Sequence, residues 1–130
     1  MTALDNLLKS YRNGTSLSCV TAYDASIAKY LETQGVNIIL VGDSLGQVIK
    51  GDKSTHNVSF EEIIYHAKCV TSGTNKATVM VDLPKNTYNT KLTALKNSKK
   101  LINNNLADLI KIEVNSDNLD IIKYLVQKNI

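Results

Sequence analysis

Acidic residues close three short hydrophobic runs in this chain. Asp43, Asp82 and Glu113 each stand at or just beyond the far end of a stretch rich in valine, isoleucine and leucine. Because aspartate is depleted within strands, its recurrence where a buried run ends indicates a cluster of carboxylates at one rim of a sheet. The pattern therefore predicts a metal and substrate site.

A lysine accompanies the third of these acids. Period-two alternation in the run 109–114 puts Lys111 and Glu113 on one side of a strand and Ile110 and Ile112 on the other. Buried charges are tolerated when they are paired or bound to a metal. Two interpretations stay open at this point, a functional site and a structural Lys–Glu ion pair.

The elements that must position these residues alternate along the chain without an obvious linker. Capping signals mark the helices, the clearest being the Ser-x-x-Glu box of Ser59 and Glu62 before a helix that ends at Gly73. The strands are predicted at 17–21, 36–41, 78–81 and 109–114, with helices before, between and after them. This order predicts parallel strands wrapped by helices, either an open doubly wound sheet or a barrel. In both architectures, functional groups collect beyond the carboxyl ends of the strands.

Length and composition indicate one domain, residues 1–130. Hydrophobic residues make up 43% of the chain, charged residues 21%, and the net charge is +3. The lysines are scattered and lack interleaved aromatic residues, so we expect no nucleic-acid partner. No apolar stretch is long enough to cross a bilayer and no signal peptide is recognisable, so a cytoplasmic location is expected. Cys19 and Cys69 have no metal or redox spacing and are expected to be free, buried thiols.

Other polar residues are less specific. Gly42 would allow a close approach of backbone and ligand, and Ser44 offers a hydroxyl beside Asp43, although an ordinary turn explains both. His66 is expected in the core or behind the site, and His56 in an exposed loop. The sequence has neither a phosphate-binding loop nor a Gly-x-Ser-x-Gly elbow, which argues against a nucleotide site and a serine hydrolase.

Several motifs, taken together and in order, resemble the ketopantoate hydroxymethyltransferase (3-methyl-2-oxobutanoate hydroxymethyltransferase) family. The resemblance runs from Ser18 to Val114. Its strings are Thr21-Ala-Tyr-Asp24, Val41-Gly-Asp-Ser-Leu-Gly46, Gly51 with Ser54-Thr55, Tyr65-His66, Asp82-Leu-Pro84 with Tyr88, and Ile110-Lys-Ile-Glu113.

This resemblance implies a (β/α)₈ TIM barrel of the phosphoenolpyruvate/pyruvate superfamily, assembled as a homo-oligomer, usually a decamer. It implies transfer of a hydroxymethyl group from 5,10-methylenetetrahydrofolate to 3-methyl-2-oxobutanoate, giving 2-dehydropantoate in pantothenate biosynthesis. Magnesium would bind at Asp43, Asp82 and Glu113. The substrate would be bound by Asp43, Ser44, Asp82 and Lys111, with Ser44 and Lys111 at its carboxylate and keto region.

The chain also departs from the family. The loop 52–57 and the pair Lys85-Asn86 differ from the usual pattern, which affects loop shape and pterin contacts. About four β/α units follow the N-terminal helix, and the family's catalytic base belongs to the missing C-terminal half, so no catalytic residue is assigned. We expect a complementing half, a second copy, or, as the alternative, a truncated non-catalytic remnant or assembly half that retains the metal and keto-acid site. The chain alone is expected to bind without turnover.

Overall fold

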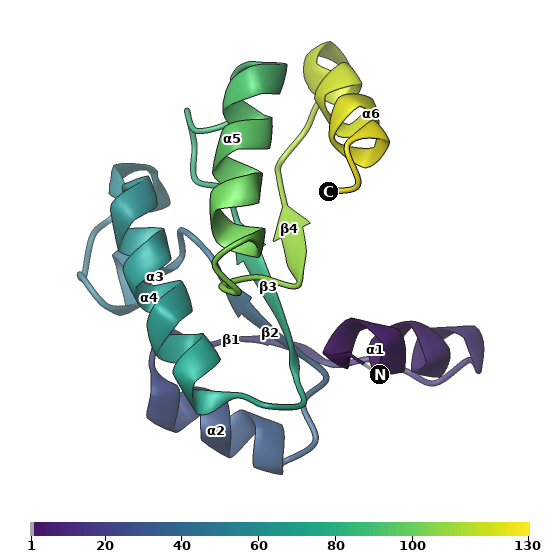
Figure 1. Ribbon diagram of the computed structural model, residues 1–130. Helices are drawn as coiled ribbons and strands as arrows, with labels where there is room; N and C mark the ends of the chain where they lie inside the picture. Colours follow the sequence, from purple (N-terminus) through teal and green to yellow (C-terminus); the bar gives the residue numbers. More distant parts are fainter. Residues whose placement is uncertain (1) are drawn as a thin grey trace.

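The computed structural model describes residues 2–130, apart from the side chain of Asp117, and has one parallel sheet in this region (Figure 1). Its strands stand in the order β1 (Cys19–Thr21), β2 (Ile38–Val41), β3 (Thr78–Asp82) and β4 (Leu109–Lys111). Each strand pairs in parallel with the next one in the chain. Parallel neighbours joined by helical crossovers are the repeating unit of a β/α barrel, and this sheet contains four such strands in sequence order.

Helices connect the strands and extend beyond both ends of the sheet. Local capping explains where four of them begin, because Thr2, Asp24, Ser59 and Thr90 each accept a backbone N–H of the first turn. The predicted capping box of Ser59 and Glu62 is confirmed. The helices are α1 (Ala3–Arg12), α2 (Ala25–Thr33), α3 (Leu45–Val48), α4 (Phe60–Gly73), α5 (Lys91–Ile102) and α6 (Leu119–Gln127), with single 3₁₀ turns η1 (Thr55–Asn57) and η2 (Ser116–Asn118).

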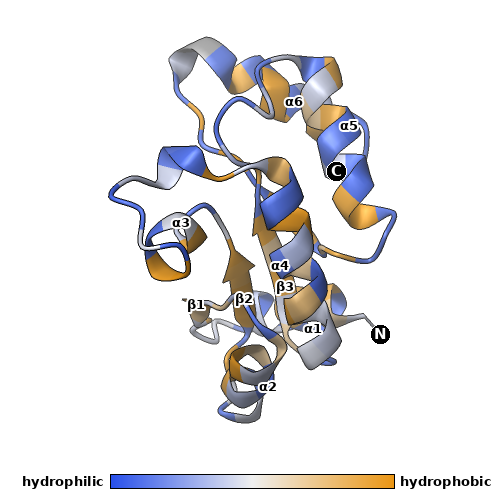
Figure 2. Cartoon of the chain, turned by 90° about the vertical axis from the view of Figure 1, so that its left-hand side faces the viewer, coloured by the Kyte–Doolittle hydropathy of each residue, from blue (hydrophilic) through white to orange (hydrophobic). Residues whose placement is uncertain are grey.

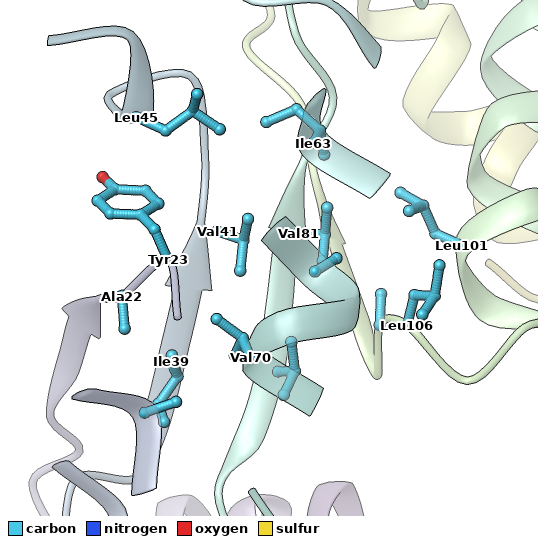
Figure 3. Packing of buried hydrophobic residues seen from close by; sticks show 14 of the residues in the cluster. Ala22, Tyr23, Ile39, Val41, Leu45, Ile63, Val70, Val81, Leu101 and Leu106 are labelled. Atoms are coloured by element: carbon cyan, nitrogen blue, oxygen red, sulfur yellow. The ribbon is translucent and has the colours of Figure 1, made fainter. Parts of the chain in front are cut away.

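The hydrophobic core lies between the sheet and the helices. Ile39 and Val41 of β2 and Val81 of β3 are fully buried, and they belong to one cluster with Ile63 and Val70 of α4 (Figure 3). Figure 2 shows β2 and β3 as strongly hydrophobic segments, whereas the helices carry mixed residues. Because successive side chains of a strand point to opposite faces of the sheet, every second residue of β2 and β3 packs against the helices.

The opposite face of the sheet is less covered. Leu40, Met80 and Leu109 are register partners across β2, β3 and β4, and all three are only partly buried. Within residues 2–130, β1 and β4 each have a neighbour on one side only. A closed barrel would cover this face and pair both edges.

Several sequence-based expectations about local structure need correction. The fourth strand ends at Lys111 instead of reaching residue 114, and the first two strands begin two residues later than expected. Cys19 and Cys69 are free, as predicted, but Cys19 is exposed and Cys69 is half-buried. Their predicted burial was wrong: within residues 2–130, Cys19 lies on a strand with a neighbour on one side only, and Cys69 is only partly covered on α4.

Gly73 ends α4 for a reason that the sequence did not indicate. A Cβ atom at this position would lie 2.2 Å from the carbonyl oxygen of Ala25 at the start of α2. The glycine therefore permits close packing of two helices. None of the helices within residues 2–130 has the length and apolar character needed to cross a membrane.

Candidate functional site

The carboxyl ends of β3 and β4 bring a carboxylate and an ammonium group together. Asp82 and Lys111 are register partners, and their side chains leave the same face of the sheet. Lys111 Nζ donates a hydrogen bond to Asp82 Oδ2 at 2.6 Å. The nearer acidic partner of Lys111 is thus Asp82, whereas Glu113, the partner in the predicted ion pair, lies 3.6 Å away.

Asp82 is the most buried acid of this group. Its side chain is 8% exposed, and Oδ1 is buried without a hydrogen-bond partner. Burial raises the pKa of Asp82 above its ordinary value even though the hydrogen bond and charge of Lys111 oppose the shift. An uncompensated lone pair in this position favours a ligand that brings positive charge or a proton donor.

The two other predicted acids act on Asp82 electrostatically. The negative charges of Asp43, just after β2, and of Glu113, just after β4, both contribute to the raised pKa of Asp82. Glu113 Oε1 lies 3.6 Å from Lys111 Nζ, and its side chain is 75% exposed. Glu113 therefore extends from the loop after β4 toward solvent and contacts the outer side of the ammonium group.

Lys111 holds its proton firmly in these surroundings. Burial lowers the pKa of Lys111, but the hydrogen bond and charge of Asp82, together with the charge of Glu113, raise it further. The net pKa lies above its ordinary value, so the group stays an ammonium ion at neutral pH. It can bind the carboxylate or the developing oxyanion of a ligand.

A second polar contact forms between the ends of β1 and β2. The hydroxyl groups of Tyr23 and Ser44 are hydrogen-bonded to each other. His66 of α4 approaches the same region, with Nδ1 at 2.7 Å from the backbone oxygen of Tyr23. His66 thus lies behind the site, as the sequence predicted.

Tyr23 is the site residue that motif reasoning did not single out. A usable signal was present, because Tyr23 follows β1 by two residues and so lies at the same rim as the acids.

Gly42 lies against the site in a way that was not expected. A Cβ atom there would be 3.4 Å from the Cβ of Asp82, so this glycine lets β2 end close to the buried carboxylate.

An open cleft of about 690 Å³ lies beside these side chains; among the described residues, Asp82 lines it, whereas Lys111, Ser44 and Tyr23 do not. Its size matches the range of small-molecule sites. The acids Asp43, Asp82 and Glu113 line one part of it, and the exposed His56 belongs to its wall. Further lining comes from Thr55, Leu83, Lys85, Asn86, Tyr88, Asn89, Val114, Asn115 and Asn118. Both segments that depart from the family pattern therefore contribute to the wall of the cleft.

Divalent metal binding can be tested against this donor set. Among residues 2–130, no three His, Cys, Asp or Glu side chains are gathered in the arrangement of a metal site. Lys111 lies beside two of the predicted ligands and neutralises part of their charge. Nevertheless, the unpartnered Oδ1 of Asp82 and the nearby Asp43 are hard oxygen donors of the type that Mg²⁺ prefers. The residues present fit such an ion.

The fold and the cleft define half of a β/α barrel with acids and a lysine at the carboxyl ends of its strands. The ketopantoate hydroxymethyltransferase family model matches residues 1–130. The chain belongs to this family. Similar proteins named 3-methyl-2-oxobutanoate hydroxymethyltransferase include one from Methylococcus capsulatus, 38% identical over 98% of this chain, and one from Clostridium botulinum, 42% identical over 90% of it.

These relatives are longer proteins. The matched part is 47% of the Methylococcus protein and 43% of the Clostridium protein, so the chain spans about half the length of the relatives that it matches. The fold is also similar to solved structures. A 2,3-dimethylmalate lyase of the PEP mutase/isocitrate lyase superfamily superimposes with a TM-score of 0.74 at 16% identity, over 98% of this chain and 48% of the lyase chain. The predicted TIM-barrel family is thereby confirmed, with half of the barrel present.

Proposed function

We propose that this protein provides the metal- and keto-acid-binding half of a 3-methyl-2-oxobutanoate hydroxymethyltransferase site. The observation that carries the proposal is the buried Asp82, which has one oxygen on Lys111 and the other without a partner, at the rim of the cleft. Family membership favours 3-methyl-2-oxobutanoate, the keto acid in the name of the relatives, as the substrate. The reaction would serve pantothenate biosynthesis.

The reaction consumes 3-methyl-2-oxobutanoate, 5,10-methylenetetrahydrofolate and water, and releases 2-dehydropantoate and tetrahydrofolate. The C3–H bond of the keto acid breaks, the proton goes to a base, and the electron pair moves toward the keto oxygen. C3 forms a bond with the one-carbon unit, and both C–N bonds that hold this unit to the folate break. Water supplies the hydroxyl group of the product, and the two nitrogen atoms of tetrahydrofolate take up the proton of that water and the proton removed from C3. We infer that this chain stabilises the developing negative charge on oxygen, while the base comes from the second half of the barrel.

Each residue of the rim has a defined part in this scheme. Lys111 would hold the negative charge of the keto acid through its ammonium group. Ser44 would donate a hydrogen bond to the same part of the ligand. Asp43, Asp82 and Glu113 would hold Mg²⁺, directly or through water. When bound, the ion would withdraw electron density from the keto oxygen and so acidify the C3–H bond.

Completion of the barrel is part of the proposal. The half-exposed row of Leu40, Met80 and Leu109 and the two open sheet edges favour a partner that offers the same kind of surface. We propose that four further β/α units, of the kind found in the second half of the family, complete the barrel. Higher assembly as in the family would follow from a completed barrel.

A binding experiment tests the site. Calorimetry with Mg²⁺ and 3-methyl-2-oxobutanoate should detect binding to the chain and at least a tenfold loss in Asp82→Asn. Asp120→Asn is the matched control, because Asp120 is an exposed acid on α6 that pairs with Lys91 instead. Equal binding by Asp82→Asn and the unaltered chain would disprove the site.

A complementation experiment tests the reaction. The chain is purified alone and together with the C-terminal half of the Methylococcus capsulatus relative, and deuterium exchange at C3 is followed by NMR. We expect exchange and hydroxymethyl transfer only with both halves, and light scattering should show a complex. Exchange by a monodisperse monomer of this chain would contradict the assignment of the base to the second half.

A further inference from the structure

The hydroxyl group of Ser44 is held by a distant tyrosine. Ser44 is the N-cap residue of α3, and a serine there ordinarily accepts a hydrogen bond from the first turn of its own helix. No such bond is present. Its Oγ is instead hydrogen-bonded to the phenol oxygen of Tyr23, 21 residues earlier in the chain. A contact between two strand ends therefore determines where this hydroxyl lies.

Tyr23 is itself fixed on two sides. Its ring is buried in the core, where it lies below Leu45 and above Ala22 in Figure 3. Its backbone oxygen accepts a hydrogen bond from His66 Nδ1 at 2.7 Å, and the two rings meet edge to face at 6.2 Å. Because a carbonyl oxygen can only accept, Nδ1 of His66 carries the hydrogen. The phenol therefore has little freedom to move away from Ser44.

The chemistry of the two hydroxyls gives this contact a direction. A carboxylate or enolate oxygen accepts hydrogen bonds and offers none, so a serine that binds it must donate. Ser44 has a single hydrogen. If the phenol donates to Ser44 Oγ, that hydrogen is free for the ligand, and the bond from the phenol strengthens the donation. If Ser44 donated to the phenol instead, Ser44 would have no hydrogen left for an anion.

We propose that Tyr23 is a positioning residue, which orients Ser44 so that its hydroxyl donates to the anionic oxygen of the bound keto acid. The phenol O–H donates to Ser44 Oγ, and His66 keeps the tyrosine backbone in place. This inference rests on the proposed function, because it takes the ligand to be an α-keto acid at the rim of the cleft. It assigns a task in binding to the Thr-Ala-Tyr-Asp string.

A double-mutant cycle tests this role. Binding is measured by calorimetry for Tyr23→Phe, Ser44→Ala and the double variant, with Mg²⁺ and 3-methyl-2-oxobutanoate, and separately with Mg²⁺ and oxalate. Tyr23→Phe should weaken binding about fivefold, as expected for the loss of one neutral hydrogen bond. Ser44→Ala should weaken it at least tenfold, because the lost bond is to a charged group. In the Ser44→Ala background, Tyr23→Phe should change nothing.

Two further variants separate positioning from packing. Tyr30→Phe removes the same hydroxyl from an exposed tyrosine of α2 and should bind like the unaltered chain. Replacement of Tyr23 by 3-fluorotyrosine keeps the ring and makes the phenol a stronger donor. It should tighten binding when Ser44 is present and have no effect in Ser44→Ala. If Tyr23→Phe does not fold, the comparison of 3-fluorotyrosine at position 23 with and without the Ser44 hydroxyl tests the proposal in its place.

The outcomes are distinct. The proposal is overturned if Tyr23→Phe weakens binding equally with and without the Ser44 hydroxyl, or not at all. If the unaltered chain binds oxalate but not the keto acid, the proposed function fails. The double-mutant cycle measured with oxalate then still tests whether Tyr23 positions Ser44. If neither anion binds, Tyr23 has no ligand to position and the proposal is overturned as well.

Discussion

Replacing Lys111 by methionine would leave the most buried acid of the site without its partner. In the unaltered protein the ammonium group lies 2.6 Å from Asp82 Oδ2, and the lysine and aspartate side chains are 37% and 8% exposed. Methionine preserves the length and much of the volume of the side chain. The substitution therefore tests the charge with little change in packing.

The expected loss of stability follows from the burial of the pair. Removing one partner of a fully buried ion pair costs about 3–5 kcal/mol, whereas exposed pairs contribute about 0–1 kcal/mol. Since the lysine is one-third exposed and the aspartate is almost fully buried, we expect an intermediate loss of about 2 kcal/mol for Lys111→Met. For a chain of this length, that lowers Tm by about 8 °C.

Divalent cations should partly reverse this loss. Because Mg²⁺ and the ammonium group neutralise the same carboxylate, the variant should gain more stability from Mg²⁺ than the unaltered chain does. Binding of 3-methyl-2-oxobutanoate should be lost even with Mg²⁺ present, since the ligand would have lost its own cationic partner. Thermal unfolding with and without Mg²⁺, followed by calorimetry with the keto acid, measures both effects.

The control is Lys29→Met, which removes an exposed lysine of α2 and should change stability by no more than about 0.5 kcal/mol. A Lys111→Met variant as stable as the control would show that Asp82 does not need the ammonium group. A variant that loses stability but retains keto-acid binding would assign Lys111 a structural role only. Either result would refute the reasoning.

Three further substitutions test other parts of the structure. Glu62→Ala should cost about 1 kcal/mol at neutral pH. Hydrogen bonds to Ser59, and then Lys50, lower the pKa of Glu62 to about 2 from its ordinary 4.5, so this contribution is present above the ordinary value and disappears as pH falls toward about 2. Urea unfolding of both proteins across this pH range measures the difference between their free energies of unfolding. A difference that did not change with pH would contradict the assignment. Glu32→Ala removes the acceptor of three consecutive backbone N–H groups at residues 75–77, and hydrogen exchange of those amides should accelerate selectively. Gly73→Ala should destabilise by at least about 2 kcal/mol in chemical denaturation, because the added methyl group overlaps the backbone of α2; an unchanged midpoint would mean that the helices separate freely.

The sequence allowed the order of elements and the common rim of the acids to be predicted, because both depend on periodicity and on parallel topology. The parity of β4 was also predictable, and it placed Lys111 on the face opposite Ile110, which packs with the helix-side core. The position of Glu113 was harder to predict from the sequence. Its strand ends at Lys111, since Lys111 is the last residue with a register partner in β3, and the chain then turns into a loop.

The contacts that sequence reasoning missed are those between distant segments. The bond between Tyr23 and Ser44 joins residues after two different strands, and nothing in the spacing of either segment indicates it. The short helix α3 escaped prediction because four residues are too few to show a helical period. Gly73 was interpreted through its backbone, whereas its neighbour across the helix interface is what requires a glycine.

The candidate site and the edge of the sheet at β4 are physically coupled through Lys111. Lys111 is bonded to Asp82 at the rim, and it also borders an apolar groove between β4 and α6, whose lining includes Met80, Ile110 and Ile122. Water that reaches this groove screens the charge of the ammonium group, and a covering layer of side chains would remove that screening. Closing the barrel would therefore strengthen both the Asp82–Lys111 pair and its attraction for an anionic ligand, in addition to bringing a base. Completion of the fold and completion of the chemistry are thus expected to occur together, because the same surface serves both.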